Sequence, residues 1–565
     1  MKKLSLYFYT LKDLKLVQVV HQIIYKCKKR FEVARFISRN SLPKHNENFK
    51  LFILELDFDK GYLSRFNLGD LITWKINILH EAHFLHSEEW EIEEASHLWN
   101  YNLQYLEFLI PLAIKYKTTH DIMWYQLWKE FFESWIEHPV VDGLESYTIS
   151  MRIPNLLICV EIFKEELQKD NYFWQKINSN LYAQYRYLWN NMEYRLLANH
   201  FFENIKAVII SALYFEEQDI YKKALKKLYQ ELQEQILEDG LHYELSFMYH
   251  HIVLEGLLRV VKAMLSCEKG DDAESLRGII IKMAESMCSI EKGIGRIPLF
   301  NDSGNNVAKS LRALRSTVEE IYQCRLRDDY TVFYKSGYGK IYNGNAALIF
   351  DSGALGPKYM SGHSHCDCLS FELFIDKKPL FVNSGTYLYQ GKERSYFRSS
   401  KAHNTIMIDS REQAELWGEH RCAKKTHNFS LEKLKNGLRG KFSSFCGDRF
   451  ERTITIEDSI FKIYDKVKAC DKKKHDLELF FHIAPGYTFF RFTNLKLGIK
   501  NRNTEEIVAR MEFSPDVDIT VHDRTGELCM YAEDFGKKCQ IETLEIKKKF
   551  VNETTELVKI ILEER

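Results

Sequence analysis

The chain has 565 residues, enough for two to four domains of ordinary size. Its 79 Lys and Arg residues balance its 79 Asp and Glu residues, so no overall field favours nucleic acid or an anionic membrane surface. Twelve cysteines are scattered without a C-x-x-C pair, which is typical of reduced thiols. We therefore expect a cytoplasmic protein, with the periplasm as the alternative.

The first segment, residues 1 to about 48, is basic and has a helical pattern that ends near Pro43. Its start resembles a signal peptide, but Lys12, Asp13 and Lys15 interrupt the apolar run and no small-residue cleavage site follows. We expect an amphipathic helix of the mature protein; contact with a partner or membrane surface stays open beside a solvated helix face. No run of about 18 apolar residues occurs, so we expect no transmembrane segment.

Residues from about 71 to 327 predict one helix after another. Apolar residues recur every three or four positions, and the turns between segments carry Asp-Gly, Pro or Lys-Gly-Asp-Asp. Many amphipathic helices joined by short loops favour antiparallel hairpins arranged as a toroid or an array. No fixed-period repeat supports a regular solenoid.

After about residue 328 the pattern changes to that of strands. The segments AALIFDS, LSFELFID, ERTITIED and LELFFHI alternate or run with β-branched residues, and Gly, Asn, Asp or Pro separates them. This pattern favours an antiparallel β-sandwich. We therefore expect an α+β chain of two domains, helical over residues 1–327 and a β-sandwich over residues 328–565.

Residues 362–405 concentrate histidines, an aspartate, tyrosines and arginines in one short stretch. If the stretch is a strand, residues two apart share a face. His363, His365 and Asp367 then point one way, while Ser364 and Cys366 point the other. The three polar side chains would face one site together.

Two helical motifs carry further polar groups. At helical spacing His200, Glu203 and Asn204 share one face, and Asn199 lies beside Glu203. Polar groups in an apolar helix are either satisfied or serve a site. A second helix opens with Glu244 and carries Tyr249 about one turn in. A tyrosine whose pKa is lowered by cationic or hydrogen-bonding neighbours acts as a general acid or base. Taken singly, the motifs also fit a structural hydrogen-bond cluster and a core tyrosine.

Taken together, these motifs resemble the heparinase II/III-like polysaccharide lyases, which include heparin, heparan sulfate and alginate lyases. The resemblance spans most of residues 95–485. It implies an incomplete α/α toroid followed by an antiparallel β-sandwich. The matching motifs are Asn199-His200 with Glu203, Asp239-Gly240 through Glu244 to Tyr249-His250, His363-x-His365-x-Asp367-x-Leu369-Ser370-Phe371, Gly385-Thr386-Tyr387, and Tyr396-Phe397-Arg398-Ser399 before Ala402-His403-Asn404-Thr405.

The resemblance also implies a reaction, β-elimination at a uronic acid of an anionic polysaccharide or oligosaccharide. The C5 proton is weakly acidic while the sugar carboxylate keeps its charge, so such an enzyme must neutralise that charge. By resemblance, Asn199 and His363 neutralise it, and Tyr249 protonates the leaving oxygen at C4. Either His200 or Tyr249 itself removes the C5 proton. Substrate contacts are expected from Arg152, Glu203, Glu244, Tyr396 and Arg398.

Members of this family often hold a structural zinc ion, and the matching positions here are His365, Asn383 and His403. The middle residue departs from the family's aspartate. An amide oxygen is a poorer zinc ligand than a carboxylate. Weaker zinc binding, completion by another group, and absence of the metal all stay open.

Two other functions stay open as well. A glycoside hydrolase needs two carboxylates, which Glu203 and Glu244 could supply. A catalytically silent carbohydrate-binding protein of a polysaccharide assembly system needs no reaction at all. The sequence leaves the exact glycan, its sulfation, the endo or exo mode and the oligomeric state undetermined.

Overall fold

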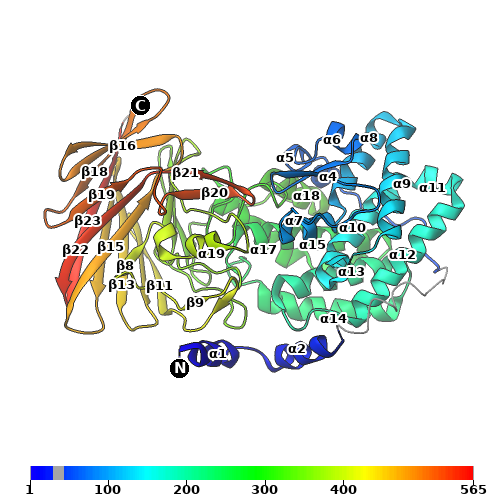
Figure 1. Cartoon of the computed structure of the whole chain (residues 1–565), viewed down its shortest axis with the longest axis horizontal. Helices are drawn as coiled ribbons and strands as arrows, with labels where there is room; N and C mark the ends of the chain where they lie inside the picture. Colours follow the sequence, from blue (N-terminus) through cyan, green and yellow to red (C-terminus); the bar gives the residue numbers. More distant parts are fainter. Residues whose placement is uncertain (1, 29–42, 141, 564–565) are drawn as a thin grey trace.

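The computed structural model describes residues 2–28, 43–140 and 142–563. Figure 1 shows a helical part and a sheet part side by side, with the first two helices beneath them. The predicted α+β class is confirmed: helices arranged as a toroid precede a domain of antiparallel sheets.

Helices dominate the N-terminal part of the chain. They are α1 (Lys2–Lys12), α2 (Leu16–Lys28), α4 (Leu54–Asp57), α5 (Lys60–Leu63), α6 (Leu68–Ile72), α7 (His97–Leu103), α8 (Ile110–Thr119), α9 (Ile122–Glu137), α10 (Ser146–Ile162), α11 (Lys164–Lys169), α12 (Asn171–Asn190), α13 (Ala198–Tyr214), α14 (Gln218–Gln235), α15 (Phe247–Ser266), α16 (Gly270–Ser275), α17 (Arg277–Glu291) and α18 (Leu311–Tyr322), with 3-10 turns at η1 (Glu107–Leu109) and η2 (Asp142–Leu144).

Burial separates the inner helices from the outer ones. Every residue of α13 except His200 is buried, and most of α15 is buried as well, so these two helices form the centre of the helical part. Outer helices such as α14 and α18 bury one apolar face and leave a charged face in water. Ser246 begins α15 as its N-cap, because its hydroxyl accepts from the Tyr249 N–H.

One hairpin lies inside the region that the sequence predicts as purely helical. Its strands are β1 (Lys75–Ile78) and β2 (Glu81–Phe84), and Leu79 and His80 form the two-residue turn with φ of 52° and 62°. Hairpin turns with positive φ usually contain Gly, Asn or Asp. The prediction missed the hairpin because neither turn residue gives that signal.

The N-terminal segment forms two helices, α1 and α2, and residues 43–50 are not helical. Residues 29–42, part of the segment predicted as helical, lie outside the described residues. Among the residues that the structure describes, no helix combines the length and apolar character needed to cross a bilayer.

The sheet part contains three large antiparallel sheets. Their strand orders are β3-β4-β5-β6-β7, β19-β22-β15-β8 and β11-β12-β13-β14-β23-β18-β17-β16. One apolar core holds side chains from all three sheets, so they pack face to face as a sandwich. The helix α18 ends at Tyr322 and the first strand of this part begins at Val332.

The elements of this part are β3 (Val332–Phe333), β4 (Tyr338–Asn343), β5 (Ala346–Asp351), β6 (Phe371–Ile375), β7 (Lys378–Phe381), α19 (Lys392–Phe397), η3 (Ser400–Ala402), β8 (Ile406–Ile408), β9 (Leu416–Trp417), β10 (Arg421–Cys422), β11 (His427–Leu434), β12 (Gly437–Ser443), β13 (Arg449–Glu457), β14 (Ile460–Lys468), β15 (Lys474–His482), β16 (Tyr487–Thr493), β17 (Lys496–Asn501), β18 (Ile507–Phe513), β19 (Asp518–His522), β20 (Met530–Asp534), β21 (Lys537–Gln540), β22 (Thr543–Val551) and β23 (Glu553–Leu562).

The prediction that His363, His365 and Asp367 lie along one strand is wrong. Residues 362–370 form a buried loop, and β6 begins only at Phe371. Much of the loop backbone bonds to side chains and other loops, as when the His365 N–H donates to Asn301 Oδ1 at 2.9 Å, and only its last residues reach β5. The alternation of polar residues over His363, His365 and Asp367 therefore does not indicate a strand here.

Candidate active site

A cavity of about 1270 Å³ lies between the helical part and the sheet part. Residues of α7, α10, α13 and α15 line one side, loops before β6 and after β7 together with β9 and β10 line another, and α1 and α2 line a third. Pockets for drug-sized ligands measure roughly 300–1,000 Å³. This cavity is larger than that range.

Tyr249 lies in the first turn of α15 and reaches the cavity. Its hydroxyl is 2.7 Å from the hydroxyl of Tyr389, and its ring stacks on His363 with centroids 4.2 Å apart. Burial, reinforced by Tyr389, raises the pKa of Tyr249 well above its usual value of 10.0. The neighbours therefore do not lower the pKa of Tyr249, and the phenol keeps its proton at neutral pH.

His363 lies in the loop before β6 and is fixed by a carboxylate from the helical part. Its Nδ1 is 2.5 Å from Glu244 Oε2. Burial alone would raise the pKa of Glu244, but His363 lowers it to about 2, so the carboxylate is ionised. An ionised carboxylate only accepts, so Nδ1 carries the proton and Nε2 is left for the cavity.

Asn199 lies directly behind this pair, at the start of α13. Its backbone N–H and its side-chain Nδ2 both donate to Glu244 Oε1, at 3.0 and 2.9 Å. The preceding residues Leu197 and Ala198 have φ of 62° and 53°, a strained conformation that clusters at functional sites. Among the described residues, Asn199 Oδ1 is buried without a hydrogen-bond partner.

His200, the next residue of α13, lines the cavity. Its Nδ1 is 3.2 Å from Glu193 Oε2, and its ring lies 4.3 Å from that of Tyr147. Burial would raise the pKa of Glu193, but His200 and Arg195 lower it. The ionised carboxylate fixes the imidazole so that Nε2 is free to exchange a proton with a ligand.

The structure thus brings together the four residues predicted as catalytic. Tyr249, His200 and His363 line the cavity, while Asn199 is connected to His363 through the carboxylate of Glu244. The helical domain supplies three of the four and the sheet domain supplies His363.

The prediction of substrate contact is corrected for three residues of the helical part. Arg152 is fully buried, and its guanidinium donates to Gln184 and to two backbone carbonyls. Glu203 is buried and paired with Lys206. Glu244 lies behind the cavity wall and orients Asn199 and His363. All three side chains are buried and bound to protein groups, although Glu203 Oε1 has no partner among the described residues, so the role is structural or positioning.

Two residues of the sheet part need the same correction. Arg398 is buried and donates to the carbonyls of Ser361, Ser364 and Glu419, which holds the loop that carries His363. The Tyr396 hydroxyl lies 2.9 Å from the Leu528 carbonyl, away from the described cavity lining.

Several cavity residues escaped the sequence analysis. Tyr389 follows the quoted Gly-Thr-Tyr motif by two positions, and Tyr147 precedes Arg152 by five. His420 also lines the cavity, and burial together with Arg394 lowers its pKa to about 4. Tyr389 and Tyr147 could have been identified as candidates from their nearness to the recognised motifs.

A cluster of possible metal ligands lies near this loop. Donor atoms of His365, Asp367 and His403 all lie within 4.8 Å of one another. Among the described residues, His365 Nδ1 and His403 Nε2 are buried without hydrogen-bond partners. Asn383 Oδ1 instead accepts from Ser370 at 2.6 Å. The predicted histidine pair is therefore present, and Asp367 is a third candidate donor beside it.

Two family patterns together match almost the whole chain. The pattern described as Heparinase II/III N-terminus matches residues 20–325, and that described as Heparinase II/III-like, C-terminal matches residues 326–556. The chain belongs to the heparinase II/III-like family. This confirms the resemblance that the motifs indicated.

A curated relative points the same way. A heparin-sulfate lyase of Bacteroides thetaiotaomicron (strain ATCC 29148) is 23% identical over 374 residues, which cover 57% of this chain and 53% of the relative. The matched region thus spans about half the length of this heparinase-family relative.

Solved structures confirm the fold. Heparinase III superposes with a TM-score of 0.70 at 17% identity, covering 98% of this chain and 93% of the other. A mutant of heparan sulfate lyase HepC from Pedobacter heparinus superposes with a TM-score of 0.62 at 13% identity, covering 97% and 89%. The heparinase III toroid and β-sandwich are therefore the architecture of this chain.

Proposed function

We propose that this protein is a polysaccharide lyase that cleaves a uronic-acid-containing glycan by β-elimination. The observation that carries the proposal is the meeting of Tyr249, His200 and His363, from both domains, around one cavity large enough for an oligosaccharide. Family membership and the lyase named among its relatives support the same reaction.

In the proposed first step, the uronate carboxylate is neutralised. His363 donates from Nε2 in its imidazolium form, with its Nδ1–H held by Glu244, and Asn199 donates the second N–H of its Nδ2, whose first N–H is held by the same carboxylate. Neutralisation makes the C5 proton more acidic, because the negative charge that develops on the carboxylate oxygens is then stabilised by donors already oriented towards it.

In the proposed elimination, Tyr249 acts as the proton donor. Its raised pKa keeps the phenol protonated until the C4 oxygen leaves with negative charge. His200 removes the C5 proton, since Glu193 fixes its Nδ1 and stabilises the imidazolium that forms. A substrate with the C5 proton on the other face of the ring would place it next to Tyr249 instead.

The substrate class in this proposal is an anionic glycosaminoglycan. The cavity wall includes the exposed cationic side chains of Lys358 and Arg421, which suit carboxylate or sulfate groups. A heparin-sulfate lyase among the relatives supports this class. The glycoside hydrolase alternative is not favoured, because Glu203 and Glu244 are both buried and occupied by protein partners.

A bound zinc ion fits this protein as a structural element. His365, Asp367 and His403 would hold it, and the two unpartnered imidazole nitrogens support the fit. Zinc would cross-link the loop before β6, through His365 and Asp367, to His403 before β8. Our proposal gives it no part in proton transfer; these residues hold the loop that positions His363.

The test is turnover of a panel of heparan sulfate, hyaluronan, chondroitin, alginate and bacterial capsule glycans, followed by ultraviolet absorbance of the unsaturated product. Wild-type protein should produce it from at least one uronate glycan, and Tyr249→Phe and His363→Ala should not. Normal turnover by both variants would reject the assignment. Binding without turnover across the panel would favour a silent glycan-binding protein.

A further inference from the structure

The first two helices present an apolar face to solvent. Leu4 and Phe8 of α1 are 74% and 63% exposed, and Leu16, Val20 and Ile23 of α2 are 78%, 44% and 60% exposed. Within each helix these positions recur every three or four residues and fall on one side. We call these five side chains the outer patch. Isolated exposed apolar residues are ordinary, but a continuous stripe marks an interaction surface.

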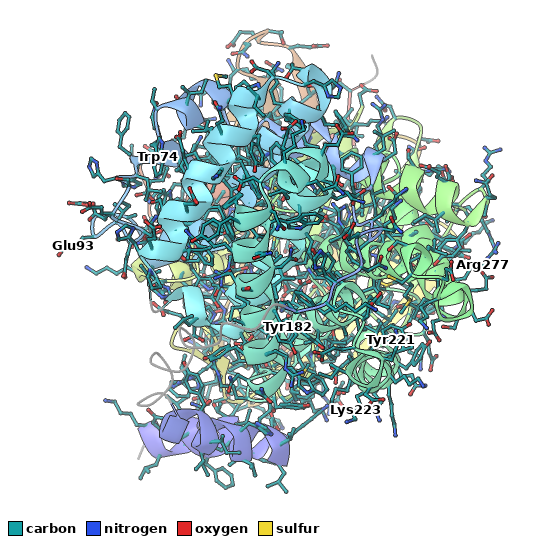
Figure 2. All side chains as sticks on the ribbon, turned by 90° about the vertical axis from the view of Figure 1, so that its right-hand side faces the viewer. Trp74, Glu93, Tyr182, Tyr221, Lys223 and Arg277 are labelled. Atoms are coloured by element: carbon teal, nitrogen blue, oxygen red, sulfur yellow. The ribbon has the colours of Figure 1, made fainter. Side chains whose placement is uncertain are left out.

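The other side of both helices is held against the two domains. On α1, Thr10 Oγ1 accepts from Trp417 Nε1 of β9 at 3.0 Å. On α2, Gln18 Nε2 donates to the Leu196 carbonyl of the helical domain at 3.3 Å. In Figures 1 and 2 the pair lies along one edge of the molecule. These contacts fix which face of the helices points outward.

The charge of this segment differs from that of the chain. Residues 1–42 contain ten Lys and Arg residues and two Asp and Glu residues, a net charge of +8, whereas the whole chain has a net charge of zero. Lys3 and Lys12 are exposed on α1 beside the outer patch, whereas Lys26 of α2 lines the cavity. The apolar stripe is thus accompanied by positive charge.

We propose that the outer patch and its lysines dock the protein onto an anionic lipid surface, with α1 and α2 lying in the headgroup plane. An apolar stripe flanked by lysines is the pattern of helices that lie in a membrane interface. With 11 and 13 residues, the helices are too short to span a bilayer. A second copy is disfavoured as the occupant, because it would bring two segments of charge +8 together.

The experiment is flotation of the full-length protein with lipid vesicles. Protein should float with phosphatidylcholine vesicles that contain phosphatidylglycerol, float less with phosphatidylcholine alone, and be released by added salt. Lys12→Gln should lower the partition constant about fivefold, the effect expected from one lysine near an anionic surface. Phe8→Ser should lower it roughly tenfold or more, because an aromatic side chain no longer enters the interface.

The matched control is Phe492→Ser on β16, which removes a phenylalanine that is 47% exposed on the sheet domain and should not change vesicle binding. Circular dichroism melting confirms that each variant is folded. The proposal is overturned if the protein floats with neither vesicle, or if Phe492→Ser weakens flotation as much as Phe8→Ser. A doubled solution mass that Phe8→Ser abolishes would also overturn it, by assigning the patch to a second copy.

Discussion

His363 of the sheet domain and Glu244 of the helical domain share a hydrogen bond of 2.5 Å. The same carboxylate accepts from the backbone and the side chain of Asn199. One buried carboxylate therefore holds both proposed charge neutralisers in place. His363 comes from the sheet domain and Asn199 from the helical domain. The site is therefore complete only when the two domains are docked.

The first prediction concerns that carboxylate. Glu244→Gln keeps the shape of the side chain but removes the charge that fixes the His363 tautomer. We expect kcat to fall about tenfold to a hundredfold, because a charged hydrogen bond is worth about 1.5–3 kcal/mol. Steady-state kinetics measures the loss. Glu556→Gln, a buried carboxylate on β23, is the control and should retain kcat. If Glu244→Gln and Glu556→Gln lowered kcat equally, the positioning role of Glu244 would be contradicted.

The second prediction is the pH dependence of stability. Burial would raise the pKa of Glu244, yet His363 lowers it to about 2 from 4.5. The stabilisation is thus complete above pH 4.5 and is lost as the pH falls towards 2, because the unfolded chain binds the proton more readily. Urea unfolding across this range should show wild type losing on the order of 1–3 kcal/mol more than Glu244→Gln. Parallel curves for the two proteins would contradict the assignment.

The third prediction concerns the proton donor. Tyr249→Phe keeps the ring that stacks on His363 and removes only the hydroxyl. We expect kcat to fall by about 10²–10⁴, the usual contribution of a positioned acid, with a small change in KM. Tyr396→Phe is the matched control, since its hydroxyl bonds to the Leu528 carbonyl outside the cavity. Should Tyr396→Phe prove as damaging, the cavity assignment would be wrong.

The fourth prediction separates two candidates for the third metal donor. Asp367→Asn should lower the zinc content of purified protein measured by mass spectrometry, whereas Asn383→Ser should leave most of it. A carboxylate binds zinc better than an amide does. His365→Ala serves as the positive control for loss of the metal. The opposite order for Asp367 and Asn383 would restore the ligand set that the sequence suggested.

The sequence placed three of the four candidate catalytic residues on helices, and the structure has them there. Asn199, His200 and Tyr249 lie on the long helices α13 and α15, where a 3.6-residue period shows which side chains share a face. It failed for the loop that carries His363, because the contacts that fix a buried loop come from residues distant in the chain. Glu244, for example, is 119 residues from His363.

Substrate-binding roles that were assigned from residue type alone were the hardest to predict. Arg152 and Arg398 suggested anion binding, yet both are buried and donate to backbone carbonyls. A guanidinium has five donors and satisfies carbonyl groups as readily as a sugar carboxylate. Only the three-dimensional arrangement separates these uses, as it does for the missed Tyr389.

The most direct test of the proposed lyase reaction is digestion in water enriched in heavy oxygen, followed by mass spectrometry of the fragments. Elimination cleaves the C4–O bond, so the new reducing end keeps its original oxygen and the other fragment is an unsaturated uronate. We predict unlabelled fragments at the moment of cleavage, with the unsaturated product absent for Tyr249→Phe. Heavy oxygen at the new reducing end, with no unsaturated product, would show hydrolysis and contradict the account.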